Sequence, residues 1–144
     1  MIMPYLTIAP SKGGRGVFST RNIPKDTIIE ISPVIILSPA ERKTIEKTKL
    51  FDYIFEWGKS RKKGCVALGY ISLYNHEYAS NCNYDMDFDN RLMTITTVRA
   101  IKKGEELCIN YNADPNDKTP VWFHHKIEGS AKVKSQKIKA RQKR

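Results

Sequence analysis

Hydrophobic residues in this 144-residue chain come in short runs separated by closely spaced turns, and long helical stripes are missing. Residues 27–37 are rich in Ile and Val and are broken only by Pro33, so they are predicted to form a strand. Further strands are predicted over residues 65–68, 84–88, 92–98 and 107–110. The aromatic run over residues 51–57 is predicted to belong to the core. Asp89-Asn90 tolerates left-handed backbone, which makes a hairpin the natural connection between the strands on either side.

Helix signals are few and short. Residues 38–41 read Ser-Pro-Ala-Glu, a capping-box pattern with proline at the first helical position, so a helix is predicted to about Lys47. Residues 119–120 (Thr-Pro) are predicted to cap a second helix through Trp122 and Phe123. Many short strands, frequent turns and little helix predict a mainly β fold with short helices.

Composition adds that the chain is an ordinary globular protein, with 40% hydrophobic and 28% charged residues. Its length suits one domain with a modest core. The sequence shows no apolar run of membrane-spanning length and no signal peptide, so we expect an intracellular protein without membrane association.

The cysteines, Cys65, Cys82 and Cys108, form no Cys-x-x-Cys pair, and His124-His125 has no cysteine nearby. A disulfide framework is therefore not expected, and neither is a structural zinc site. We expect three small apolar side chains in the core and no metal.

The net charge of +10 is concentrated at the C-terminus. Residues 126–144 carry eight Lys/Arg and one Glu, a net +7, so +3 remains for residues 1–125. We therefore expect a domain over residues 1–125 and a basic tail that is disordered or marginally helical. Such a tail either contacts nucleic acid nonspecifically through phosphates or is simply solvated, and both interpretations stay open.

Two local motifs are weak on their own. Residues 13–16 (Gly-Gly-Arg-Gly) lack the strand and helix of a dinucleotide-binding turn and the Lys-Ser/Thr of a phosphate-binding loop, so a hairpin turn is the better interpretation. Asp85, Asp87 and Asp89 begin like a calcium loop, but Thr96 occupies the position that needs Glu. Their alternation instead places them on the solvated face of a strand.

The combination of motifs is more specific than any one of them. The matching segments are residues 13–16, 23–30, 67–70, 73–76 (Leu-Tyr-Asn-His), Asn81, 104–107 (Gly-Glu-Glu-Leu) and Tyr111. In this order and spacing they resemble the SET-domain protein lysine methyltransferases, over roughly residues 5–125. The resemblance implies a fold of several small β-sheets (β-clip) with a knot-like C-terminal crossing.

The resemblance also implies S-adenosylmethionine as the cofactor. In the family, the glycine-rich turn gives backbone groups to the methionine part of the cofactor. Here that turn comprises Gly14, Arg15 and Gly16, with Lys12 beside it. Asn75 and His76 match the Asn-His pair that holds the cofactor in the family. In family members, this pair includes a backbone contact to the adenine.

Further residues match positions at the methyl-transfer centre and the lysine channel. Tyr111 matches the tyrosine at the centre, and Tyr84 matches one that bonds the substrate amine in some members. Ile109 stands where some members place a second aromatic. Trp122 and Phe123 are expected to close the channel, because the C-terminal cysteine module that many members use for this is missing from the sequence.

The sequence departs from the family at several positions. Glu77-Tyr78 and Ser80 replace residues of the common Asn-His-Ser-Cys-x-Pro-Asn pattern, and Asn110 stands where Asp is frequent. These positions shape the loop, so they affect binding geometry more than reaction type. No departure removes an expected catalytic group.

The chemistry fits these residue types. Methyl transfer from a sulfonium needs a neutral amine, although free lysine has a pKa near about 10.4. A narrow apolar channel and an adjacent sulfonium disfavour the ammonium, and tyrosine hydroxyls and carbonyls orient the amine. Whether Tyr111 acts as a base or only orients the amine stays open.

The predicted function is methylation of a lysine ε-amine in a protein substrate. A histone, another chromatin-like DNA-binding protein, a ribosomal protein and other cytosolic proteins all stay open as substrates. The compartment is accordingly the cytoplasm, or the nucleus or nucleoid if the substrate is chromatin. The alternative is a SET-like module that binds nucleic acid or chromatin through the tail with little catalysis. The oligomeric state stays open.

Overall fold

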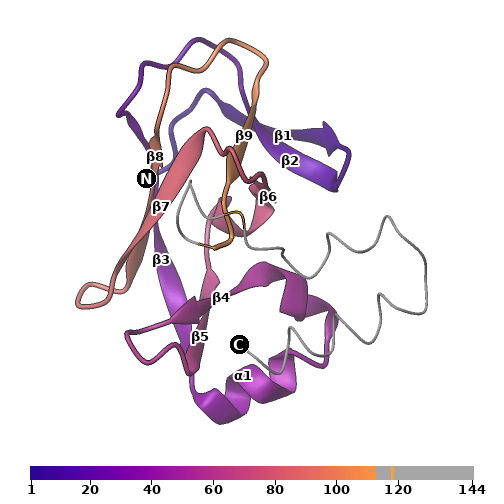
Figure 1. Cartoon of the computed structure of the whole chain (residues 1–144), viewed down its shortest axis with the longest axis vertical. Helices are drawn as coiled ribbons and strands as arrows, with labels where there is room; N and C mark the ends of the chain where they lie inside the picture. The colour runs from indigo at the N-terminus through magenta and orange to yellow at the C-terminus, as the bar shows by residue number, and fades with distance from the viewer. Residues whose placement is uncertain (113–117, 119–144) are drawn as a thin grey trace.

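The structure, a computed structural model, describes residues 1–112 and residue 118. Its strands form two sheets, with the hairpin of residues 6–19 pointing sideways from the upper half of the molecule and the helix of residues 39–45 at the lower end (Figure 1). The predictions for Trp122, Phe123, the second helix and the basic tail lie outside the described residues.

The four-stranded sheet has the order β1-β2-β9-β6. Its strands are β1 (Leu6–Ser11), β2 (Gly14–Ser19), β9 (Glu106–Ile109) and β6 (Asn75–His76). β1 and β2 form an antiparallel hairpin from Leu6↔Ser19 to Ser11↔Gly14, which confirms the turn predicted for the glycine-rich segment. β6 pairs with β9 in parallel, so the Asn-His pair lies beside the C-terminal strand.

The five-stranded sheet has the order β4-β5-β3-β8-β7. Its strands are β3 (Ile28–Leu37), β4 (Ile54–Trp57), β5 (Lys63–Ala67), β7 (Cys82–Asp87) and β8 (Leu92–Thr97). The central strand β3 pairs with β8 up to Pro33 and with β5 from Val34 onward. Pro33, which has no N–H to donate, therefore lies where the strand changes partners.

The short helices follow local signals. α1 (Pro39–Ile45) begins with the predicted capping box: Glu41 N donates to Ser38 Oγ (3.2 Å), and Ser38 N donates to Glu41 Oε2 (2.8 Å). Two 3-10 helices, η1 (Lys49–Tyr53) and η2 (Ile71–Leu73), were not expected from the sequence.

The predicted hairpin β7–β8 is present, but its left-handed residue is Arg91 (φ 56°) and not Asp89 or Asn90. The aromatic segment predicted as core is divided. Phe51 and Trp57 are buried, whereas Tyr53 is exposed. Only Phe51 is buried in η1, whereas β4 buries Ile54 and Trp57 and half-buries the two residues between them.

The core joins the two sheets. β9 contributes Leu107 and Ile109, and β8 contributes Met93 and Ile95, all fully buried. This places the end of β9, and the residues that follow it, on a rigid support. With strands and short helices around one core, the structure has the mainly β architecture predicted from the sequence.

Candidate active site

Three polar side chains from separate strands meet beneath the tip of the β1–β2 hairpin. The Asn75 amide nitrogen donates to Glu106 Oε1 (2.7 Å), to Ser11 Oγ (3.2 Å) and to the Arg15 carbonyl oxygen (3.1 Å). Ser11 Oγ donates to the Glu106 carboxylate at 2.9 and 3.0 Å. Asn75 therefore fastens the glycine-rich turn to β9.

Glycine is required where this turn approaches Asn75. A Cβ on Gly16 would overlap the Glu106 carboxylate, and a Cβ on Gly13 would lie 2.9 Å from Asn75 Oδ1. Gly14 has φ +112°, a conformation that side chains disfavour. The three glycines let the backbone pack directly on the polar cluster and leave the tip open to a ligand.

The parallel pairing of β6 with β9 sets His76 beside Tyr111. The Tyr111 backbone N donates to His76 Nδ1 (3.0 Å), and the two ring centroids are 5.2 Å apart. Because Nδ1 accepts this bond, a neutral His76 carries its proton on Nε2. His76 thus holds the backbone of Tyr111 in place.

The Tyr111 hydroxyl is tied to the core through Tyr74. It donates to the Tyr74 carbonyl oxygen (2.8 Å), and the Tyr74 hydroxyl donates to Glu30 Oε2 (3.1 Å). Glu30 also accepts from Tyr70 N and Ser32 Oγ, both at 2.8 Å. Burial raises the pKa of the Glu30 carboxyl above its usual value, and burial raises that of Tyr74 well above its own.

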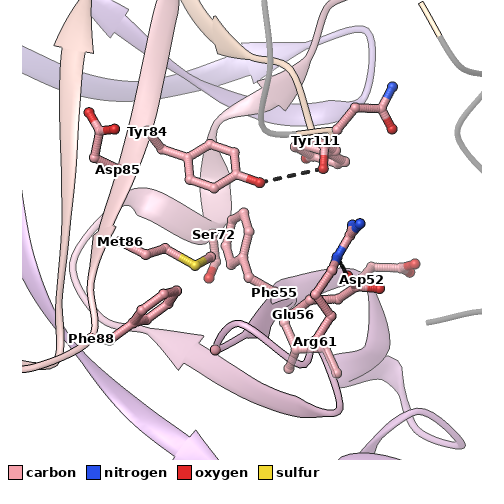
Figure 2. A pocket seen from close by; sticks show the side chains of 13 residues that line it. Asp52, Phe55, Glu56, Arg61, Ser72, Tyr84, Asp85, Met86, Phe88 and Tyr111 are labelled. Atoms are coloured by element: carbon pink, nitrogen blue, oxygen red, sulfur yellow. Dashed lines mark hydrogen bonds and ion pairs between the residues drawn. The ribbon is translucent and has the colours of Figure 1, made fainter. Parts of the chain in front are cut away.

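Two cavities meet at Tyr111. The larger, of about 1070 Å³, lies beside the glycine-rich turn, Asn75 and His76. The smaller, of about 540 Å³, is bordered by β4, β7 and the residues after β9 (Figure 2). Both are lined by Asp52, Ser72 and Tyr111, so groups bound in them would approach each other at Tyr111.

Aromatic side chains form the wall of the smaller cavity next to Tyr111. The Phe55 ring lies edge-on to Tyr84 and Tyr111, with centroid separations of 5.5 and 6.4 Å. Tyr84 Oη donates to the Tyr111 carbonyl oxygen at 3.5 Å, and Figure 2 shows the two tyrosines facing each other. The wall combines apolar surface with two hydroxyls.

Comparison with known proteins decides the family. A family model described as SET domain matches residues 14–112. The chain belongs to the SET-domain family. It is 36% identical to the histone-lysine N-methyltransferase specific for lysine 37 of histone H3 from Schizosaccharomyces pombe (strain 972), over 83% of this chain and 77% of that protein. It is also 30% identical to a crystal structure of a candidate histone methyltransferase from Plasmodium falciparum (TM-score 0.59), over 76% of this chain and 98% of that one.

These relationships confirm the SET fold and the class of enzyme predicted from the motifs, a protein-lysine N-methyltransferase. SET methyltransferases use S-adenosylmethionine as the methyl donor.

Residues predicted to bind the cofactor lie together in this SET domain. The larger cavity is lined by Lys12, Gly14, Arg15, Asn75 and His76. Gly16 lies behind them against Asn75 and Glu106. Segments separated by about sixty residues in the sequence thus share one pocket.

Of the predicted channel residues, Tyr84 and Tyr111 line the smaller cavity. Ile109 is fully buried in the core, and it lines neither cavity. Its placement therefore gives the channel role no support. The alternation of strand β9 explains this, because Ile109 lies on the same face as Leu107 and points into the core.

Several residues at the site were missed by sequence reasoning. Glu106 is part of the Gly-Glu-Glu-Leu motif, yet its link to Asn75 was not foreseen. Phe55 was assigned to the core, and Asp52 and Ser72 carry no motif of their own. A polar residue inside the aromatic run, such as Asp52, was the available signal that the run is not all core.

The cysteines of this SET domain are unreactive in character. Burial raises the pKa of Cys65, Cys82 and Cys108 to about 12, and all three thiols are free. Among residues 1–112 and 118, no group of His, Cys, Asp and Glu is arranged to hold a metal ion. Within the same residues, no helix has the length and hydrophobicity needed to cross a bilayer.

Proposed function

We propose that this enzyme methylates a lysine of a histone, with the cofactor in the larger cavity and the lysine entering through the smaller one. The observation that carries the proposal is the position of Tyr111, which lines both cavities. An in-line displacement needs donor and acceptor to approach from opposite directions, and two cavities that meet at one tyrosine suit this geometry.

The residues of the larger cavity fit S-adenosylmethionine. The open turn of Lys12, Gly14 and Arg15 offers backbone groups and positive charge to the carboxylate of an amino acid. Gly16 permits the close packing of this turn on Asn75, and His76 borders the same space. A volume of about 1070 Å³ accommodates a nucleoside joined to an amino acid.

When bound, the cofactor supplies an electrophilic methyl group on a sulfonium. The enzyme's part is to orient a neutral amine toward it. The Tyr84 and Tyr111 hydroxyls, beside Phe55, combine polar orienting groups with an apolar wall that disfavours the ammonium form of lysine. The Tyr74 carbonyl fixes the direction of the Tyr111 hydroxyl.

Histone as the substrate follows from the S. pombe relative, which acts on lysine 37 of histone H3. Carboxylates at the smaller cavity, from Asp52, Glu56 and Asp85, suit a basic peptide. A chromatin substrate in turn places the enzyme in the nucleus or nucleoid. The alternative of a binding module with little catalysis is disfavoured by Tyr111, whose hydroxyl is hydrogen-bonded between the cavities.

We further propose that the catalytic domain comprises residues 1–125 and that residues 126–144 form a basic tail, on the charge distribution of the sequence. The net +7 of the tail suits attraction to DNA-bound substrates, and it also offers lysines for automethylation.

The test is transfer of labelled methyl from S-adenosylmethionine to purified core histones. Tyr111→Phe should lower turnover by about 100-fold or more, because positioning of the reacting atoms is lost. Its affinity for S-adenosylhomocysteine, measured by calorimetry, should change little. Tyr70→Phe is the matched control, since Tyr70 lines neither cavity. Near-normal turnover by Tyr111→Phe would remove Tyr111 from the reaction.

A further inference from the structure

The smaller cavity already contains one positive side chain. Within residues 1–112 and 118, its charged lining residues are Asp52, Glu56, Asp85 and one cation, Arg61. Arg61 lies in the loop between β4 and β5, and its Nε donates to Glu56 Oε2 at 2.6 Å. Figure 2 shows Arg61, Glu56 and Asp52 on one side of the cavity and Asp85 on the other, beside Tyr84. In the space proposed for a basic peptide, the Arg61 guanidinium thus already forms an ion pair with the Glu56 carboxylate.

The two partners of this ion pair differ in exposure. The Arg61 side chain is 73% exposed, whereas that of Glu56 is 18% exposed. Ion pairs with a highly exposed partner are weak, since water competes for the charge. Arg61 can therefore return to solvent at little cost, whereas Glu56 stays in the wall, where its Oε2 can accept from another cation.

Glu56 and the loop backbone are held without the Arg61 side chain. The buried Arg42 guanidinium donates to the carbonyl oxygens of Arg61 (2.6 Å) and Lys63 (3.2 Å), and to Glu56 Oε1 at 3.4 Å. Arg42 is in turn paired with Glu46 Oε1 (2.8 Å). The Glu56 carboxylate is therefore held at Oε1 by Arg42, whereas its partner at Oε2, Arg61, can be exchanged for another cation.

We propose that Glu56 binds a Lys or Arg side chain that flanks the target lysine in the substrate. In the free enzyme, Arg61 forms an ion pair with Glu56 and so competes with the substrate for this carboxylate. This inference rests on the proposed function, because it assumes that the peptide enters the smaller cavity. A peptide with a basic flank displaces Arg61 and restores the same ion pair. A peptide without one gains nothing from the displacement.

The inference can be tested by steady-state kinetics. The substrate is the histone peptide that the wild-type enzyme methylates most efficiently. A second version of this peptide has its flanking Lys and Arg replaced by Gln. Arg61→Gln should lower KM for the basic peptide about two- to five-fold, the worth of an exposed ion pair, with the change confined to KM. KM for the neutral peptide should stay the same. Lys62→Gln, with the same charge change in the same loop but outside the cavity lining, should not reproduce the effect.

Glu56→Gln should raise KM for the basic peptide and remove the difference between the two peptides. In that background, Arg61→Gln should have no further effect. If Glu56→Gln does not fold, the KM values of Arg61→Gln for the two peptides are sufficient to test the inference. An unchanged KM in Arg61→Gln, or an equal change in Lys62→Gln, would overturn the inference while wild-type methylation upholds the proposed function. Absence of histone methylation by the wild type would instead overturn the proposed function, and this inference with it.

Discussion

Tyr111 is fixed at three atoms, two of them by residues 74–76 and one by β7. Its backbone N donates to His76, its hydroxyl donates to the Tyr74 carbonyl, and its carbonyl accepts from Tyr84 at 3.5 Å. Phe55 packs edge-on against its ring. A side chain held this way loses little entropy on binding substrate, which is the preorganisation that positioning of a reacting amine requires.

Tyr84 is the residue at which we expect the number of added methyl groups to be set. Its hydroxyl lies beside the carbonyl of Tyr111, where it can bond the substrate amine and occupy space. We expect mono- or dimethyl-lysine as the main wild-type product. Tyr84→Phe should raise the ratio of trimethylated to monomethylated product about two- to ten-fold, the worth of one hydrogen bond.

Mass spectrometry of a methylated histone peptide over time measures this ratio. Tyr70→Phe serves as the control for loss of a tyrosine hydroxyl away from the cavities. Dominant trimethylation by the wild type, or an equal ratio in Tyr84→Phe, would show that Tyr84 does not limit methylation.

At the level of secondary structure, β9 positions the residues of the site, and the segment before β7 holds β9 in place. Asn81 Nδ2 donates to the Glu106 carbonyl (2.8 Å), and the Cys108 backbone N donates to Asn81 Oδ1 (2.8 Å). Nearby, Glu77 N donates to the carbonyl of Ile109 (3.1 Å). One buried amide side chain thus adds two hydrogen bonds to β9 beside its short partner strand β6.

Asn81→Ala should lower the free energy of unfolding by about 2 to 4 kcal/mol, because it leaves a donor and an acceptor of β9 unpaired in the interior. Urea denaturation followed by circular dichroism measures this change. Asn83→Ala is the control, since Asn83 makes no side-chain hydrogen bond recorded within residues 1–112 and 118. Equal losses in the two variants would mean that Asn81 does not clamp β9.

Over the whole molecule, Glu30 connects the two sheets. It lies fully buried on the central strand β3 and accepts from the Tyr74 hydroxyl and Tyr70 N, which belong to the segment leading into β6. Burial raises its pKa above the usual 4.5, so the folded protein favours the protonated carboxyl. The stability that this provides is complete below the unfolded-state pKa and is lost as pH rises through the folded-state value.

The melting temperature of Glu30→Gln should therefore rise relative to that of the wild type as pH increases above the usual carboxyl pKa of 4.5, because glutamine mimics the protonated form. Thermal unfolding across this range tests it. Glu105→Gln should keep a constant difference from the wild type over this range, since hydrogen bonding to Arg99 lowers the pKa of Glu105, and its contribution to stability changes only as pH falls below the usual 4.5. A gap between Glu30→Gln and wild type that is constant with pH would mean that the Glu30 carboxyl does not titrate differently on folding.

Features that depend on neighbouring residues could be predicted from the sequence. Residue patterns predicted strands β3, β5, β7, β8 and β9 but not β1, β4 and β6, the capping box predicted the start of α1, and the glycine-rich segment predicted a hairpin turn. Local chemistry settles such features, since each depends on residues a few positions apart. The order of the motifs also identified the family, which the match to residues 14–112 confirms.

Which distant residues meet depends on the tertiary fold and could not be predicted from the sequence. The parallel pairing of β6 with β9, the bond from Asn81 to β9 and the burial of Glu30 and Arg42 join segments that no periodicity relates. A buried charged residue looks like a surface residue in a sequence, because the sequence does not show which distant side chains and backbone groups will pair with it. For the same reason Ile109, assigned to the channel by family position, lies in the core: the face that a strand residue occupies depends on what packs against the sheet.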